Sequence, residues 1–176
     1  MSQPTNKPPR FVAPGFVDLD NLDHAPDLAA SLGNMVVAWA RAETAIVKTY
    51  ALVSKLHYNE AAAAYYAIPT FESRTKTLMA LAEEINSQKP ITHFDEIVAA
   101  IGSLVDLSKT RNAWIHGVWV CRKGSNLVHT FNMKQSPKTR RPKQITANAV
   151  REHTKAVRAQ SRALEALSPV KIELRS

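Results

Sequence analysis

The sequence predicts a mainly α-helical domain with one short β-hairpin before its last helix. Three observations support this fold class. Long stretches place apolar residues three and four positions apart, as one buried face of a helix requires. Only five glycines occur in 176 residues, so few positions interrupt these stretches. Residues 118–121 and 127–131 are instead short strand-like segments that flank a polar turn, which is typical of a hairpin.

The domain organisation follows from where the apolar periodicity begins. Residues 1–24 contain four prolines and little periodicity, so we expect an extended or disordered arm there. Residues 25–176 should form the helical domain. Because proline fits the first turn of a helix, a first helix should begin near Pro26, with Asp27 as a cap. Its apolar stripe comprises Leu28, Leu32, Met35, Trp39, Ile46, Tyr50 and Val53.

Two charged residues fall within the apolar stripes of the first two helical regions. Glu43 lies in the stripe of the first helix, and Arg74 lies in that of the second region, which should start near Asn59 and break at Pro69. A buried carboxylate and a buried guanidinium are each costly alone and tolerable together. We therefore expect Glu43 to pair with Arg74 or Arg111. The second region's apolar residues are Phe71, Leu78, Leu81 and Ile85.

A third helix should start at the cap Thr92, with Asp95 completing a capping-box-like pair. Polar residues enter its buried face only in the last two turns. Asn112 and His116 are four apart and share one side of the helix. Arg111 and His116 are five apart and point roughly 140° from each other, so they converge poorly within one chain. The stripe reads Phe94, Ile97, Ile101, Leu104, Ser108, Arg111 and Ile115.

The pattern changes after Gly117, which should end the third helix. A hairpin is expected over about residues 117–133, a basic loop over residues 134–145, and a last helix over about residues 146–167. His153 falls on the apolar face of that last helix, and a core histidine explains it better than a metal ligand does.

The net charge of +8 comes from one part of the chain. Residues 134–162 hold nine Lys or Arg against one acid, and the other basic and acidic residues balance. Such a segment suits a polyanion, although a solvated surface that only improves solubility explains it about as well. The candidate RNA-binding residues are Lys134, Lys138, Arg140, Arg141, Lys143, Arg151, Lys155 and Arg158.

Several classes of protein lack their usual signals here. No stretch approaches the roughly 20 apolar residues that span a bilayer, and the N-terminus has no secretory segment, so we expect a cytoplasmic protein without a membrane partner. One cysteine leaves no disulfide framework, and no zinc-ligand spacing occurs. The absence of a glycine-rich phosphate loop argues against an NTPase or dinucleotide enzyme. We expect no metal and no cofactor.

The run Arg111-Asn112-Ala113-Trp114-Ile115-His116-Gly117 carries the strongest chemical signal. Arginine holds phosphate bidentately and keeps its charge, and histidine readily moves a proton near neutral pH. The same residues also fit an ordinary helix end, because a histidine before a glycine can interact with free carbonyls. Three features favour chemistry: the polar residues break a buried stripe, Asn112 adjoins Arg111, and tryptophans flank the run.

This run resembles the R-N-x-x-x-H signature of the HEPN superfamily, whose helical domains often act as toxin, antiphage or RNA-processing ribonucleases. The wider layout is also similar to a bacterial HEPN-like family. The resemblance covers roughly residues 27–168 and includes Trp39, Glu43, Phe71, Arg74, Leu78, Leu81, Gly117 and Trp119. It implies an antiparallel helical bundle.

The resemblance implies metal-independent RNA cleavage in a homodimer, where Arg111 of one protomer and His116 of the other meet at one phosphate. His116 would be the general acid or base in attack by the ribose 2′-hydroxyl, Arg111 would stabilise the developing charge, and Asn112 would position the phosphate. DNA lacks that hydroxyl and should not be cut. A toxin of this kind would need restraint by a cognate antitoxin, a regulatory protein or another trigger.

Two alternatives to the toxin- or defence-type endoribonuclease remain open. The chain could be a catalytically silent helical module that uses the same basic surface to bind nucleic acid or an acidic partner. A nucleotide-binding regulatory domain is a third reading, which the lack of a phosphate loop disfavours.

Overall fold

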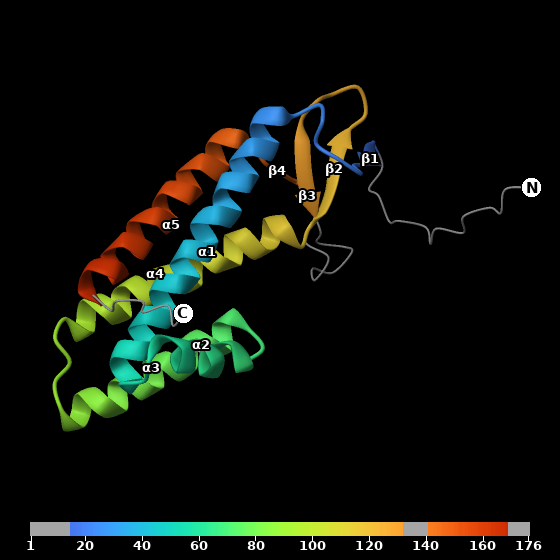
Figure 1. Cartoon of the computed structure of the whole chain (residues 1–176). Helices are drawn as coiled ribbons and strands as arrows, with labels where there is room; N and C mark the ends of the chain where they lie inside the picture. Colours follow the sequence, from blue (N-terminus) through green and yellow to red (C-terminus); the bar gives the residue numbers. More distant parts are fainter. Residues whose placement is uncertain (1–14, 132–140, 169–176) are drawn as a thin grey trace, which may run out of the picture.

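Two long parallel helices, α1 near the start of the chain and α5 near its end, form the centre of the fold. The computed structural model describes residues 15–131 and 141–168. Helices α1 and α5 pack along each other, α4 crosses beside them, and α2 and α3 lie at the end away from the sheet (Figure 1). The described residues form five helices: α1 (Pro26–Ser54), α2 (Tyr58–Ala67), α3 (Phe71–Gln88), α4 (Phe94–Ile115) and α5 (Ala147–Leu167).

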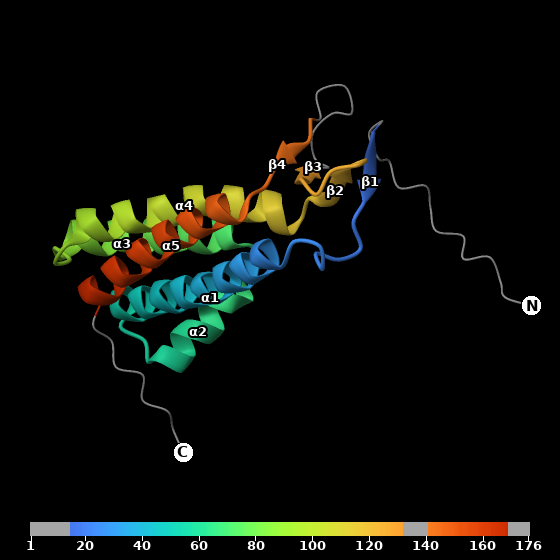
Figure 2. The same cartoon turned by 90° about the horizontal axis from the view of Figure 1, so that it is seen from above.

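A small antiparallel sheet lies at the end of the helices where α1 and α5 begin and α4 ends (Figure 2). It contains the predicted hairpin, in which Val118 pairs with Phe131 and Cys121 pairs with Val128. The strands follow the order β1-β2-β3-β4, and every neighbouring pair is antiparallel. Their bounds are β1 (Phe16–Asp18), β2 (Val118–Arg122), β3 (Val128–Phe131) and β4 (Lys143–Gln144).

The sheet corrects two expectations about the domain boundaries. Residues 16–18 of the expected arm form an edge strand on β2, so the arm is shorter than predicted and the ordered fold begins before residue 25. Lys143 and Gln144, expected in the basic loop, pair with β3 as β4. Residues 1–14 and 132–140, on which the remainder of these two predictions falls, lie outside the described residues.

The helix starts confirm the predicted place of Pro26 and contradict both predicted caps, Asp27 and Thr92. Pro26 occupies the first turn of α1 as predicted, but the N-cap is Ala25 and Asp27 lies inside the helix. The Thr146 side chain caps α5 by accepting a hydrogen bond from the Ala149 N–H at 3.1 Å. Thr92 does not cap α4, because the helix begins one residue later. The N-cap there is His93, which has a left-handed φ of 60° and makes no side-chain capping hydrogen bond.

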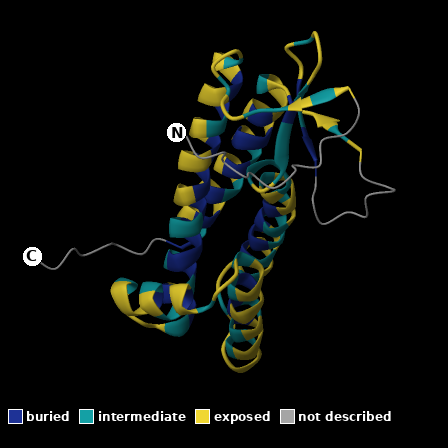
Figure 3. Cartoon of the chain, turned by 90° about the vertical axis from the view of Figure 1, so that its right-hand side faces the viewer, coloured by how far each residue is buried: buried dark blue, intermediate teal, exposed yellow. Residues whose placement is uncertain are grey.

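Buried residues, dark blue in Figure 3, lie on the inner faces of the helices. They form two clusters. The larger cluster joins all five helices and includes parts of the predicted stripes of α1 and α4, with Ile46, Leu78 and Leu104 fully buried. The smaller cluster joins the first turns of α1 and α5 to the sheet around Met35 and Val150. Within the described residues, no helix has the length and apolar character that crossing a membrane requires.

Candidate functional site

The last two turns of α4 carry the three candidate catalytic residues. Arg111 and Asn112 lie in the helix, and His116 is its C-cap, with a backbone N–H that donates to the Asn112 carbonyl at 3.0 Å. Asn112 and His116 are exposed, whereas Arg111 is partly buried. The helix end therefore presents an amide and an imidazole to solvent from neighbouring positions on one side.

Gly117 fixes the turn from α4 into β2 because its position has no room for a side chain. A Cβ atom there would lie 2.6 Å from the Ala113 carbonyl oxygen and 3.1 Å from Cβ of Thr130. Contacts this short displace backbone as well as side chains. The close packing of Gly117 against β3 thus sets where His116, its neighbour, lies.

Arg111 is held against α1 and beside Asn112. Its guanidinium carbon lies 5.6 Å from the ring centroid of Trp39, within the range of a cation–π interaction. Its Nη1 donates to Oδ1 of Asn112 at 2.8 Å, and its Nε is buried without a hydrogen-bond partner among the described residues. Trp39 is therefore a platform for Arg111, a role that its place in an apolar stripe did not predict.

A cleft of about 990 Å³ between α3 and α4 opens beside the motif. Asn112, His116 and Gly117 line it at the end of α4, and no residue of α5 does. Two exposed ion pairs also line it: Lys76 and Glu72 at 2.7 Å, and Lys109 and Asp106 at 2.7 Å.

The two ion pairs leave the cleft wall with mixed charge. The Lys76 ammonium donates to Glu72 and lowers the pKa of that carboxyl group. The hydrogen bond from Lys109 to Asp106 raises the pKa of the lysine. Since each acid is neutralised by a lysine, a phosphate entering the cleft would meet no uncompensated carboxylate from these pairs. Sequence reasoning missed all four residues, although their spacings of three and four positions on exposed helix faces signal such pairs.

The structure separates Arg111 from this cleft, as the helical spacing predicted. Asn112 and His116 line the cleft, while Arg111 packs on Trp39 and is absent from the cleft wall. Among the described residues, Arg111 is joined to the cleft wall through its hydrogen bond to Asn112. Within one chain, Arg111 and His116 therefore do not form a single pocket.

The predicted pairing of Glu43 is confirmed, and its partner is Arg74. The Arg74 Nη1 lies 3.5 Å from Oε1 of Glu43, with side-chain exposures of 16% and 24%. Arg74 also donates from Nε to the Ile68 carbonyl at 2.7 Å, and it lies over the rings of Tyr65 and Tyr66. This pair ties α1 to α3, whose first turns contribute other residues to the cleft wall. It is a support for the site, not a part of it.

Burial affects the tyrosine beneath Arg74. Tyr65 is fully buried, and its hydroxyl has no hydrogen-bond partner among the described residues. Desolvation and the nearby Glu43 carboxylate raise the pKa of Tyr65 far above its ordinary value, so the phenol stays neutral and its ring can face the guanidinium.

Part of the predicted basic surface lies on one exposed face of α5. Arg151, Lys155 and Arg158, together with Arg162, are exposed and recur every three or four residues, opposite the buried face of the helix. Arg141 and Lys143 are exposed beside and within β4. The structure does not bring these side chains into the cleft of His116. Lys134, Lys138 and Arg140 lie outside the described residues.

The tryptophans that flank the motif belong to the core. Trp114 packs edge-on against His153, with ring centroids 5.0 Å apart, and both Trp114 and Trp119 contact the smaller core cluster. His153 is 8% exposed, which confirms its prediction as a core histidine, and burial lowers its pKa. In the described part of the chain, no three His, Cys, Asp or Glu side chains gather as a metal site would require.

Comparisons of the chain with models of protein families, with curated proteins and with solved structures find no match in any of the three.

Proposed function

We propose that this protein is a HEPN-like, metal-independent endoribonuclease of toxin or defence type that acts as a homodimer. The observation that carries the proposal is the end of α4. There Asn112 and His116 face an open cleft, and Arg111 is fixed beside them by Trp39 and by its bond to Asn112. Pre-positioned cations and proton-transfer groups are what phosphodiester cleavage without a metal needs.

In the proposed reaction, the ribose 2′-oxygen forms a bond to phosphorus while the bond to the 5′-oxygen breaks. The 2′-hydroxyl gives up its proton to a base, and the leaving 5′-oxygen receives one from an acid. His116 serves as one of these two groups, since it is exposed in the cleft. Arg111 stabilises the charge on the phosphate and Asn112 orients it. The products are a 2′,3′-cyclic phosphate and a 5′-hydroxyl.

The homodimer supplies what one chain lacks. Because Arg111 and His116 of a single chain face different surroundings, a phosphate held by His116 in the cleft would take its arginine from the partner subunit. Symmetry would then create two equivalent composite sites across a two-fold axis.

RNA would reach this site along the basic face of α5. The side chains of Arg151, Arg158 and Arg162 stand on that face, and each phosphate contact releases counterions, so binding should weaken steeply with salt. A cytoplasmic toxin of this kind would be restrained by a cognate antitoxin or another regulatory protein.

A mixing experiment tests the composite site. Purified wild-type protein, Arg111→Ala and His116→Ala are each incubated with mixed RNA in EDTA, and cleavage is followed by gel. Each variant alone should be inactive. Equal amounts mixed under conditions that allow subunit exchange should regain about a quarter of the wild-type rate, because half of the dimers are mixed and each has one intact site. The matched controls are Arg41→Ala and His24→Ala. Both change exposed residues, and both variants should retain full activity.

The outcomes separate the proposal from its main alternative. Active single variants would refute the catalytic roles, and inactive variants that stay inactive when mixed would refute the composite site. If wild-type protein binds RNA and cuts none of several substrates, the chain is a silent binding module. The hydrogen bond between Arg111 and Asn112 favours the silent binding module, because this bond already occupies groups that a phosphate would need.

A further inference from the structure

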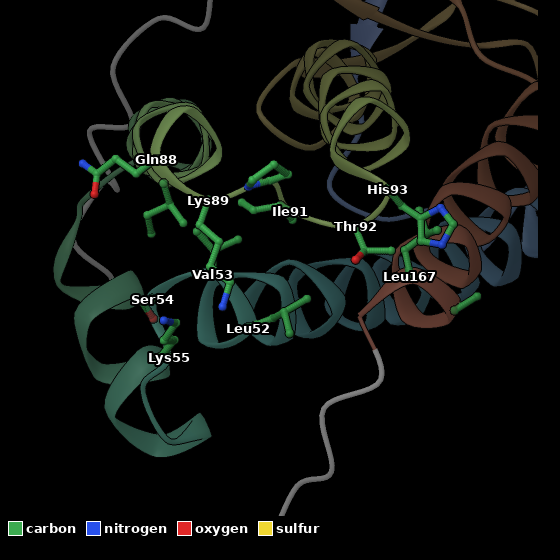
Figure 4. A pocket seen from close by; sticks show the side chains of 13 residues that line it. Leu52, Val53, Ser54, Lys55, Gln88, Lys89, Ile91, Thr92, His93 and Leu167 are labelled. Carbon is green, nitrogen blue, oxygen red and sulfur yellow. The ribbon is translucent and has the colours of Figure 1, made fainter.

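A second cavity lies at the opposite end of α4 from the motif. Its volume is about 690 Å³, within the range of small-molecule sites. The ends of α1, α3 and α5 and the connection into α4 surround it. Figure 4 shows Lys55 and Gln88 on one side of this cavity and His93 and Leu167 on the other. From His93 to His116 the helix rises roughly 35 Å, so this cavity is separate from the proposed nuclease site.

The interior of this cavity is apolar. Val53, Ile85, Ile91 and Leu167 contribute its floor and all belong to the larger core cluster or pack against it. Leu52, at its edge, is 40% exposed. A concave apolar surface favours a ligand with a hydrocarbon body, because binding removes the apolar surfaces of the cavity and of the ligand from water.

The rim of the cavity is cationic. Lys55 and Lys89 line it, and neither has an ion-pair partner among the described residues. No Asp or Glu is among the described lining residues. Three carboxylates of the adjoining turns have partners: Glu96 lies 3.4 Å from His93, Glu84 accepts from Gln88, and Glu165 lies 4.0 Å from Lys48.

Helix dipoles reduce this positive charge without reversing it. The C-termini of α1, α3 and α5 meet at the cavity, and each contributes roughly −0.5 charge, while the N-terminus of α4 contributes roughly +0.5. Their sum of about −1 is smaller than the two full charges of Lys55 and Lys89. Interaction of each lysine with its own helix end explains part of its placement. A net positive rim still remains.

The backbone supplies an independent observation. Lys55 and His93 are the described non-glycine residues with positive φ, at 58° and 60°, and both line this cavity. An L-residue in this left-handed region costs about 1–2 kcal/mol, and such residues cluster where a ligand or a switch needs them. Both residues line one cavity, and this supports a ligand site there in addition to the shape and charge of the cavity.

We propose that this cavity binds a free medium-chain fatty carboxylate, with the hydrocarbon chain on the floor formed by Val53, Ile85 and Ile91 and the carboxylate at Lys55 and Lys89. The charge of the rim selects an anion over an amine. The apolar floor selects a hydrocarbon over a small inorganic anion. The inference does not depend on the proposed nuclease activity.

Three probes of equal chain length test the inference: decanoate, decanol and decyltrimethylammonium, each kept below its micelle concentration. Binding to the full chain is measured by calorimetry and by the rise in melting temperature. Decanoate should bind at least about tenfold more tightly than the ammonium compound, and decanol should fall between them. Equal binding of all three, or no binding of decanoate, would overturn the proposal.

Charge reversal locates the head group. Lys55→Glu and Lys89→Glu should each weaken decanoate binding several-fold and leave decanol binding unchanged. Lys123→Glu makes the same change in net charge on the exposed hairpin turn and should have no effect. If Lys123→Glu weakens binding as much as the other two, the selectivity comes from net charge and the assigned head-group site is wrong.

A blocking variant locates the hydrocarbon chain. Thr92→Trp places a large ring at an exposed lining position, so it should abolish decanoate binding while circular dichroism shows a folded protein. Unchanged binding in this variant would place the ligand elsewhere. Sedimentation with phosphatidylglycerol vesicles distinguishes the source, because binding to vesicles but not to free decanoate would point to a membrane lipid and contradict the proposal.

Discussion

The two ends of α4 are built differently. At its C-terminal end, three contacts with other elements hold the helix: Arg111 packs on Trp39, Trp114 packs on His153, and Gly117 lies against β3. At its N-terminal end, the helix starts from the left-handed His93 without a side-chain cap, beside a hollow of about 690 Å³.

The difference shows what each end can do. Close packing on several sides restricts the rotamers of polar groups, which is the condition for positioning a reactive phosphate. A hollow between helix ends leaves apolar surface in contact with water, which is the condition for binding a flexible hydrocarbon. Changes at the packed end should therefore alter chemistry or stability, and changes at the hollow end should alter ligand binding.

The largest effect at the packed end is expected from Arg111→Lys. Lysine keeps the charge but loses the planar fork that binds Asn112 and that would bind a phosphate in the proposed reaction. The cleavage rate should fall about 100-fold, while the melting temperature changes little. The matched change Arg41→Lys, at an exposed position on α1, should leave the rate unchanged. A fully active Arg111→Lys enzyme would mean that only the charge matters and that the packing on Trp39 has no catalytic role.

The next effect is expected from Gly117→Ala. The new methyl group would lie 2.6 Å from the Ala113 carbonyl oxygen, so the turn into β2 must shift, at a cost of about 2 kcal/mol in unfolding free energy. Urea unfolding measures this loss. In Gly33→Ala, on the exposed side of α1, the methyl group meets no atom within 4 Å, and the protein should become more stable by about 0.5–1 kcal/mol. An equally stable Gly117→Ala would contradict the close packing at this end.

Long periodic segments explain how much of this fold the sequence could predict. The stripes of α1 and α4 extend over several turns, and each implied one buried face. Strands β1 and β4 have three and two residues, and only pairing with β2 and β3 defines them. A local sequence pattern cannot predict so short a strand, because the hydrogen-bond partners of the strand are distant in the sequence.

Some features of the candidate site could likewise be predicted from the sequence, and others could not. The pairing of Glu43 and Arg74 was predictable because both fell within apolar stripes, where an isolated charge is costly. The opposite facing of Arg111 and His116 followed from helix geometry alone. The α3–α4 cleft and the role of Trp39 depend on the distance between helices, which residue spacing does not contain.

A smaller effect on stability is expected from Glu43→Gln. It leaves Arg74 partly buried without its counter-charge and should cost about 1 kcal/mol, because both side chains keep some contact with solvent. A double-mutant cycle with Arg74→Gln should show positive coupling, because the second change removes the unpaired charge. In the exposed pair of Glu72 and Lys76, Glu72→Gln should not change the unfolding curve measurably. Additive effects of the two substitutions at Glu43 and Arg74 would refute an interaction between them.

The smallest effect should appear as a pH dependence from His153, which packs on Trp114 behind the motif. Burial lowers the pKa of this imidazole, so the unfolded state, with a pKa of about 6.5, binds a proton that the folded state refuses. Above the unfolded-state pKa, the contribution of the neutral His153 to the free energy of unfolding is fully present. It should fall as the pH drops through 6.5 toward the lower folded-state pKa. His153→Phe removes the titratable imidazole and keeps a ring against Trp114. Urea midpoints measured from pH 7.5 to 5 should therefore decline less in the variant than in the wild-type protein. Parallel declines would show that His153 stays hydrated and that the packing around Trp114 is looser than its 5.0 Å ring contact indicates.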